Sequence, residues 1–136
     1  MNYVKYWLPP IAWMGMIFLF SSQAKVQVSD VYVLQFTFFK SLHMIEYGIL
    51  SALLYRAFKN TGNRPLWQNL YLAWLLAASY GMTDEIHQVF VPTREGRMRD
   101  IVIDSIGAGL ILFLLWRYVL TAKKRLKNWV KPLEII

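Results

Sequence analysis

The stretch LYLAWLLAASYGM, Leu70–Met82, decides the class of fold because it is long, apolar and free of charged residues. Within it, the run Leu70–Ala78 is nearly apolar on every side. A helix of a soluble bundle needs a polar stripe that faces water, and this run offers none. Ile106–Leu115 has the same character. The two runs therefore favour helices embedded in lipid over a soluble helical bundle.

The composition of the whole chain agrees with this interpretation. Hydrophobic residues make up 57% of the 136 residues, whereas soluble domains contain roughly 45–50%. Six Trp and eight Tyr suit aromatic belts at two membrane–water interfaces. The absence of Cys excludes disulfides and thiolate chemistry. The first apolar run, Tyr6–Phe20, is interpreted as a retained helix because FSSQAK lacks the small-x-small pattern of a cleavage site.

Four apolar segments of roughly 20 residues, the length that crosses a bilayer, are separated by short connectors. We therefore predict an all-α polytopic membrane protein with four transmembrane helices in one domain, residues 1–136. The predicted spans are 4–22, 36–57, 66–89 and 101–120, followed by a basic tail, 121–136. The predicted connectors are 23–35, 59–65 and 90–100.

The distribution of Lys and Arg sets the predicted orientation, with ten on one side of the spans and four on the other. The ten are Lys5, Arg56, Lys59, Arg64, Arg117, Lys123, Lys124, Arg125, Lys127 and Lys131; the four are Lys25, Arg94, Arg97 and Arg99. Both termini are therefore expected to be cytoplasmic. The tail would lie on anionic lipid, at about 1 kcal/mol per charge. It carries most of the net charge of +7, so no nucleic-acid partner is needed to explain that charge.

Polar residues recur at helical spacing at the outer ends of three predicted spans. They are Lys40, His43, Glu46 and Tyr47 on the second span, Asp84, Glu85, His87 and Gln88 on the third, and Asp100 and Asp104 on the fourth. Each costs about 2.5–3.5 kcal/mol in lipid, so such residues pair with one another or line a wet site. We favour a site, because so many share one depth on three helices. Gly107–Gly109 would allow close helix approach, with packing against lipid as the alternative.

Three pieces of the chain together carry a resemblance to a known family. They are FSSQ (Phe20–Gln23), KSLHMIEYGIL (Lys40–Leu50) and TDEIHQVFVPTREGRMRDIVIDSIGAGL (Thr83–Leu110). The order Lys-x-x-His, Asp-Glu-x-x-Gln, Pro-x-Arg, Asp and Gly resembles the VanZ-like family of bacterial membrane proteins. The chain departs at Asp104, where many members carry Asn. The resemblance implies a role in the cell envelope and an association with teicoplanin resistance, but no particular reaction.

The first functional hypothesis is that the site binds or handles an anionic, lipid-linked envelope component. Arg94, Arg97 and Arg99 would lie at the headgroup level, where guanidinium groups bind phosphate or carboxylate in a bidentate manner. Lys40 would add a deeper positive charge. The expected partners are the bilayer and an anionic lipid or lipid-linked precursor, and a homodimer stays open. The residues assigned to substrate contact are Lys40, Glu46, Gln88, Arg94, Arg97, Arg99, Asp100, Asp104, Ser22 and Gln23.

The second hypothesis is a hydrolase or transferase that acts on a lipid-linked phosphate or ester. Two His and carboxylate pairs at i, i+3, His43 with Glu46 and Asp84 with His87, resemble bundle metal sites, and Asp100 or Asp104 could add a ligand. A divalent metal thus stays open as a cofactor. Metal-free acid–base catalysis is the other version. The residues assigned to catalysis are Glu85, His87, Asp84 and His43.

The third hypothesis is a non-catalytic protein that organises the envelope. In this hypothesis FSSQ is expected to cap the first helix at the outer face, with its Ser hydroxyls and Gln23 bonding loose carbonyls or the polar cluster.

Overall fold

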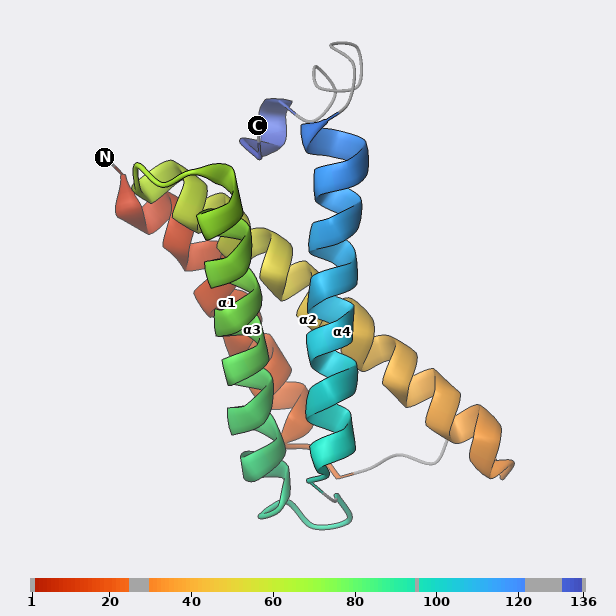
Figure 1. The fold of residues 1–136 in the computed structure, drawn as a ribbon. Coiled ribbons are helices and arrows are strands. Elements are labelled where there is room, and N and C mark those ends of the chain that lie inside the picture. The colour runs from red at the N-terminus through yellow and green to blue at the C-terminus, as the bar shows by residue number, and fades with distance from the viewer. Residues whose placement is uncertain (1, 25–29, 95, 122–130, 136) are drawn as a thin grey trace.

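A computed structural model of the chain describes residues 2–24, 30–94, 96–121 and 131–135. Within these ranges all regular structure is helical, and the bounds of the four α-helices are α1 Tyr3–Ser21, α2 Tyr32–Thr61, α3 Leu66–Gln88 and α4 Met98–Leu114. A π-helical segment, η1 (Leu115–Leu120), continues α4 directly, and a short 3-10 helix, η2 (Lys131–Leu133), lies near the C-terminus. The prediction of an all-α fold with four helices is confirmed (Figure 1).

The second helix is the main departure from the predicted bounds. It has 30 residues and begins at Tyr32 rather than at 36, and it ends at Thr61 rather than at 57. No Gly or Pro lies between Tyr32 and Gln35 to stop an earlier start, and Gly62 follows the last turn. Lys40 was predicted for the first turns, but it lies about 12 Å along the helix at 1.5 Å per residue. The connectors 23–35 and 59–65 were therefore predicted too long.

The four helices are arranged so that α2 is strongly inclined to α3 and α4, which run nearly parallel to each other in the view (Figure 1). Its first turns project away from α3 and α4, and its later turns pack among the other helices. We call the end of the bundle with Ser21, Gln88 and Met98 the site end. The opposite end, with Tyr3, Thr61 and Leu120, is the terminal end, and both ends of the chain lie there (Figure 1).

The core forms where large side chains of α2 meet small residues of α3 and α4. Tyr47, Leu50 and Leu54 are at most 1% exposed, as are Ala77 of α3 and Ala108 of α4. Ser51 adds a polar link, since its hydroxyl donates to Ala108 O at 3.0 Å. Small residues on two helices let the third approach closely, which fixes how α2 sits against the pair.

The closest helix contact lies beside the polar cluster. A Cβ added at Gly107 of α4 would lie 2.6 Å from the backbone oxygen of Met44 in α2, so only glycine fits there. The predicted close approach is thus confirmed for Gly107. Gly109 has only an ordinary contact, with Trp74 at 3.5 Å. Because Met44 adjoins His43 and Gly107 lies one turn after Asp104, this contact positions those two side chains near each other.

The predicted membrane spans have less support from the structure than the predicted number of helices. Across the residues that the structure describes, none of the helices is both long enough and apolar enough to cross a membrane. The four spans and the cytoplasmic termini stay a prediction.

At the terminal end, the last described residues dock onto α1 and α2. Glu134 accepts hydrogen bonds from Lys5 Nζ at 2.6 Å and from Arg56 at 2.8 Å, while Arg56 Nε also donates to Leu133 O at 2.8 Å. The hydrogen bond from Lys5 holds the pKa of Glu134 below its ordinary value of 4.5. Most of the predicted basic tail, residues 122–130 with Lys123, Lys124, Arg125 and Lys127, lies outside the described residues.

Candidate functional site

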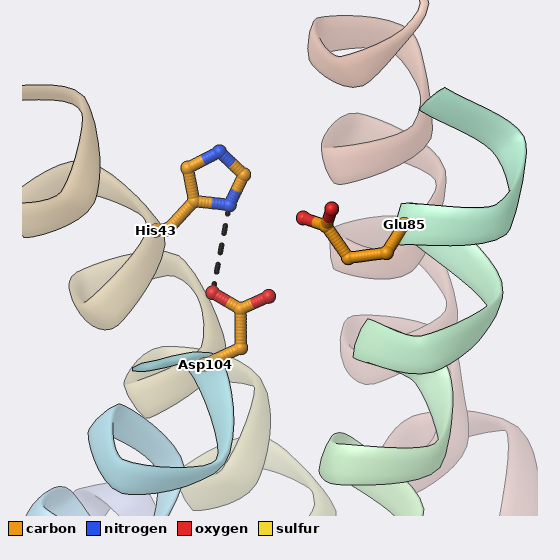
Figure 2. Close-up of side chains that lie close together, drawn as sticks. All are labelled: His43, Glu85 and Asp104. Carbon is orange, nitrogen blue, oxygen red and sulfur yellow. Dashed lines mark ion pairs between the residues drawn. The ribbon is translucent and has the colours of Figure 1, made fainter. Parts of the chain in front are cut away.

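Three side chains from three different helices meet at the site end, two of them buried and the third, His43, largely buried. His43 of α2, Glu85 of α3 and Asp104 of α4 each offer an atom, and these atoms all lie within 4.8 Å of one another. Figure 2 shows the three side chains pointing toward a common space. His43 Nδ1 lies 3.6 Å from Asp104 Oδ1, and Asp104 and Glu85 are only 1% and 3% exposed. We call these three residues the buried trio.

The buried trio has fewer hydrogen bonds than its burial demands. Among the described residues, His43 Nδ1, Glu85 Oε1 and both carboxylate oxygens of Asp104 have no hydrogen-bond partner. The other oxygen of Glu85 accepts from the backbone N–H of Arg97 at 2.9 Å. A buried polar group without a partner costs roughly 1–3 kcal/mol, and a charged one costs more. The trio therefore combines two carboxyl groups, burial and unused acceptors.

Two further buried groups extend this pattern around the trio. Asp84 is 3% exposed, and one of its oxygens accepts from Gln88 Nε2 at 2.8 Å. Its other oxygen has no hydrogen-bond partner within the described part of the chain, and neither has the hydroxyl of Tyr47. Tyr47 is fully buried, and its ring stacks beside that of His43. Asp84 and Gln88 thus form a pair, as their shared helix face predicts.

The positive charge of Lys40 is directed at Asp100 rather than at the buried trio. Lys40 Nζ lies 2.5 Å from Asp100 Oδ2, and Arg99 Nε approaches the other oxygen at 3.4 Å. The guanidinium of Arg99 also lies over the ring of Phe36, 4.7 Å from its centroid. Asp100 is buried and doubly paired, so its role is that of an anchor between α2 and the start of α4.

A pocket of about 290 Å³ lies next to His43 of the trio, between the first half of α2, the end of α3 and the start of α4. Its lining combines four cationic side chains with an aromatic wall. The lining residues are Tyr32, Gln35, Phe36, Phe39, Lys40, His43, Gln88, Thr93, Arg94, Arg97, Arg99 and Asp100. Because His43 belongs to both the lining and the buried trio, the inner end of the pocket reaches the trio.

His87 lies away from the trio and contacts the first helix. Its Nε2 is 3.0 Å from the hydroxyl of Ser22, and its ring lies 4.5 Å from that of Phe18. Two residues along a helix correspond to about 200° of rotation, so His87 and Glu85 point to different sides of α3. The structure therefore does not bring together the acid–base pair that the sequence assigned to Glu85 and His87.

The end of α1 is capped partly as predicted and partly by a residue that was assigned to substrate. Ser21 and Ser22 both donate their hydroxyls to Phe18 O, at 3.1 and 2.6 Å, as expected of FSSQ. Arg94 donates to Phe20 O and to Gln23 O, each at 2.8 Å. Gln23 thus contributes to the cap of α1 through its backbone oxygen and not through its side chain. Arg94 holds the end of α1 in addition to lining the pocket.

Glu46 belongs neither to the pocket lining nor to the trio. Its backbone oxygen accepts from Trp13 Nε1 at 2.9 Å, which places this part of α2 against α1. The His43 and Glu46 pair that was considered for a metal is thereby replaced by His43 with Glu85 and Asp104. Glu95, in the loop before α4, lies outside the described residues.

Several residues of the site were not assigned from the sequence. Gly96 packs the loop before α4 onto α3, because a Cβ there would lie 2.2 Å from Glu85 O. Tyr32, Phe36 and Phe39 form the aromatic side of the pocket. These rings were not assigned from the sequence because the second helix was predicted to begin at residue 36. A helix that begins at Tyr32 places the three rings on the same side as Lys40.

Comparison with known proteins gives one match. The model of the VanZ/LLP1 family matches residues 6–121, which is most of the chain. No curated protein and no solved structure matches it. The family match spans α2, α3 and α4 completely, α1 from its fourth residue, and every residue of the pocket and the trio. The chain therefore belongs to the VanZ/LLP1 family.

Proposed function

We propose that this chain is a membrane-embedded protein of the bacterial cell envelope whose site end faces outward and binds the anionic headgroup of a lipid-linked envelope component. The observation that carries the proposal is the pocket, in which Lys40, Arg94, Arg97 and Arg99 lie beside an aromatic wall. VanZ-like proteins are membrane proteins, and the family is named for one that gives teicoplanin resistance. An association with glycopeptide resistance fits a site at the outer surface.

Exposed apolar side chains support the membrane location. Large apolar residues face outward on every helix, including Leu8 at 59%, Leu34 at 60%, Ile86 at 56% and Phe113 at 53% exposure. Exposed apolar side chains in this number favour contact with lipid or with other proteins. The 23 residues of α3 extend about 34 Å at 1.5 Å per residue, against a hydrocarbon core of about 30 Å.

The charge distribution supports the proposed orientation. Lys5, Arg56, Arg64 and Arg117 lie toward the terminal end, and the basic tail follows η1. Because the cytoplasmic ends of membrane helices carry an excess of Lys and Arg, this distribution supports a terminal end inside and a site end outside. The polar site would then lie in the outer leaflet, and the half of the bundle near the terminal end would close the path across the membrane.

The shape of the pocket suits a headgroup with an attached apolar chain. Its volume of about 290 Å³ is at the lower end of small-molecule sites, which are roughly 300–1,000 Å³. Guanidinium groups bind phosphate oxygens in a bidentate manner. The first turns of α2 carry Tyr32, Val33 and Leu34, each at least 60% exposed, beside the aromatic wall. A prenyl or acyl tail would follow this apolar surface out to the bilayer.

A second candidate function is acid–base catalysis on a lipid-linked phosphate or ester, and the buried trio is the observation that favours it. A carboxylate and an imidazole that share a space are suited to moving a proton. His43 and Glu85 are the residues for this role, since His87 lies against α1. A non-catalytic organising protein would need the pocket but not the trio.

Binding of the headgroup is tested on the purified chain in nanodiscs of zwitterionic lipid. The measurement is the fluorescence anisotropy of a labelled polyprenyl phosphate, with labelled phosphatidylglycerol as the second anionic lipid. Arg99→Gln and Arg97→Gln should each weaken binding at least tenfold, because each removes a cation from the pocket. The matched controls Arg64→Gln and Arg117→Gln lie toward the other end and should bind like the wild type. Equal losses for all four variants would show nonspecific attraction to anionic lipid and overturn the proposal.

The role in resistance is tested in cells that express the chain, by teicoplanin and vancomycin susceptibility. The wild type should protect, and Lys40→Ala, Glu85→Gln and Arg97→Ala should not, with equal membrane levels established by immunoblot. Variants that do not accumulate would show that the polar residues hold the helices together. A wild type that gives no protection would separate the fold of the family from the phenotype for which it is named.

A further inference from the structure

We propose that His43, Glu85 and Asp104 form a binding site for one divalent transition-metal cation at the inner end of the pocket. The three ligands come from α2, α3 and α4, so one cation would tie together the three helices that build the pocket. Figure 2 shows that all three side chains converge on the same space. Two carboxylates and one imidazole with a coordination position left toward the pocket resemble the three-ligand arrangement of catalytic metal sites.

The distances fit a cation with small adjustments. Ligand atoms that bind zinc at 2.0–2.2 Å in tetrahedral geometry lie roughly 3.4 Å apart. His43 Nδ1 and Asp104 Oδ1 are 3.6 Å apart, which is close to that value and too long for a hydrogen bond. The complete set lies within 4.8 Å. A movement of the Glu85 carboxylate by about 1 Å would bring all three ligand atoms to the spacing of a tetrahedral site.

The unused acceptors point to a ligand independently of the distances. Asp104 is 1% exposed, and both of its oxygens lack a hydrogen-bond partner among the described residues, as do His43 Nδ1 and Glu85 Oε1. These are the lone pairs that a cation would take. A hydrogen-bonded polar cluster would instead show these atoms paired with one another.

The balance of charge also favours a divalent cation. When both carboxyl groups are ionised and the imidazole is neutral, as metal ligands must be, the three ligands carry −2, which one divalent cation cancels. Lys40 does not supply this charge, because it pairs with Asp100. The same pairing reduces the repulsion that a free ammonium group would exert on a cation in the trio. The oxygen of Asp84 and the hydroxyl of Tyr47 that lack partners lie in the surrounding shell, where such groups orient metal ligands.

The donor set indicates which cations would bind. Imidazole suits zinc and other first-row transition metals, whereas carboxylates alone suit magnesium, calcium and manganese. One nitrogen with two carboxylates therefore favours Zn²⁺ or Mn²⁺ over Mg²⁺. The proposal does not depend on headgroup binding or on resistance, so its test is separate from those of the proposed function.

The experiment is metal titration of the purified full chain after removal of bound metal with a chelator. Binding of Zn²⁺, Mn²⁺ and Mg²⁺ is followed by calorimetry, and bound metal is counted by mass spectrometry after dialysis. Co²⁺ serves as a spectroscopic probe, since its visible absorption reports nitrogen and oxygen ligands. The expected result is one Zn²⁺ or Mn²⁺ per chain. Asp104→Asn, Glu85→Gln and His43→Gln should each weaken binding 10-fold or more.

Two matched variants serve as controls, because they remove the same chemical groups nearby. Glu46→Gln lies one turn from His43 but outside the trio, and His87→Gln removes the other His of the chain. Both should bind metal like the wild type. No stoichiometric binding by the wild type, or binding that His87→Gln abolishes and Asp104→Asn preserves, would overturn the proposal. If one ligand variant does not fold, the metal affinities of the other two test the proposal. The rise in Tm on addition of metal is a second readout. The rise should be present in the wild type and in both controls and absent from the folded ligand variants.

Discussion

The two ends of the bundle each hold a cluster of charged residues, but the clusters differ in burial and in pairing. At the terminal end, Glu134 accepts hydrogen bonds from Lys5 and Arg56 in a partly exposed setting. At the site end, Asp104 and Glu85 are almost fully buried and keep oxygens without a hydrogen-bond partner among the described residues. In the first cluster both oxygens of the carboxylate are hydrogen-bonded, whereas the second keeps acceptor atoms without a hydrogen bond among the described residues.

The difference separates two uses of charge in one small fold. Exposed ion pairs contribute little to stability, roughly 0–1 kcal/mol, and serve to position a chain end. Buried carboxylates are costly unless they are paired, so they persist where a function requires them. Lys40 and Asp100 fall between the two, since this pair is largely buried but complete. The variants below test this contrast in order of expected effect.

The largest effect is expected at the contact that holds the site end together. Gly107→Ala should lower the free energy of unfolding by about 3 kcal/mol, because the added methyl group would collide with the backbone of Met44. The measurement is thermal unfolding in detergent by circular dichroism. Gly109→Ala is the matched control, and it should be neutral or slightly stabilising, since its methyl group meets only ordinary contacts. Equal effects of the two variants would contradict the close approach of α2 and α4.

The next effect is expected at the Lys40 and Asp100 pair. Lys40→Met should destabilise the protein by about 2 kcal/mol, less than for an isolated buried pair because Arg99 still approaches Asp100. Adding Asp100→Asn to this variant removes the stranded charge and should recover part of the loss. A double-mutant cycle by thermal unfolding gives the coupling energy. A coupling near zero would show that Lys40 does not stabilise Asp100.

A smaller effect of the opposite sign is expected in the buried trio. In the presence of a chelator, Asp104→Asn should stabilise the protein by about 1 kcal/mol, because it replaces a buried carboxyl group whose oxygens have no hydrogen-bond partner among the described residues. Asp100→Asn is the comparison, and it should destabilise under the same conditions because it breaks ion pairs. The two Tm shifts, measured side by side, should differ in sign. A large destabilisation by Asp104→Asn without metal would contradict the contrast between the clusters.

The smallest effect is expected at the terminal end. Because the pKa of Glu134 is lowered in the folded protein, its pairing contributes above pH 4.5 and is lost as the pH falls through the lowered value. The chain has no Cys, so a spin label on Leu133→Cys reports the docked end alone. Its mobility should rise only below pH 4.5. In the Glu134→Gln variant the label should be mobile at every pH. If its mobility still changed with pH in that variant, Glu134 would not be the group that holds the docked end.

The sequence alone was sufficient for the number of helices, their order and the residue types that gather at one end. Apolar runs near 20 residues long set the helices, and spacings of three and four residues place Lys40 and His43, or Asp100 and Asp104, on one face. These are local properties, because the period of a helix is the same wherever it packs. The matched depth of polar residues on three segments also indicated that they would meet.

Only the tertiary structure decided which of these residues meet. Glu85, placed at the edge of its helix face by sequence, is central to the trio, and His87 turns to Ser22. Asp100 takes Lys40, so that Asp104 pairs only with His43 among the described residues, and Arg94 caps α1. The physical reason is that helical periodicity fixes angles within one helix only. The inclination of α2 and its rotation against α3 and α4 depend on contacts such as Gly107 with Met44, between residues far apart in the chain.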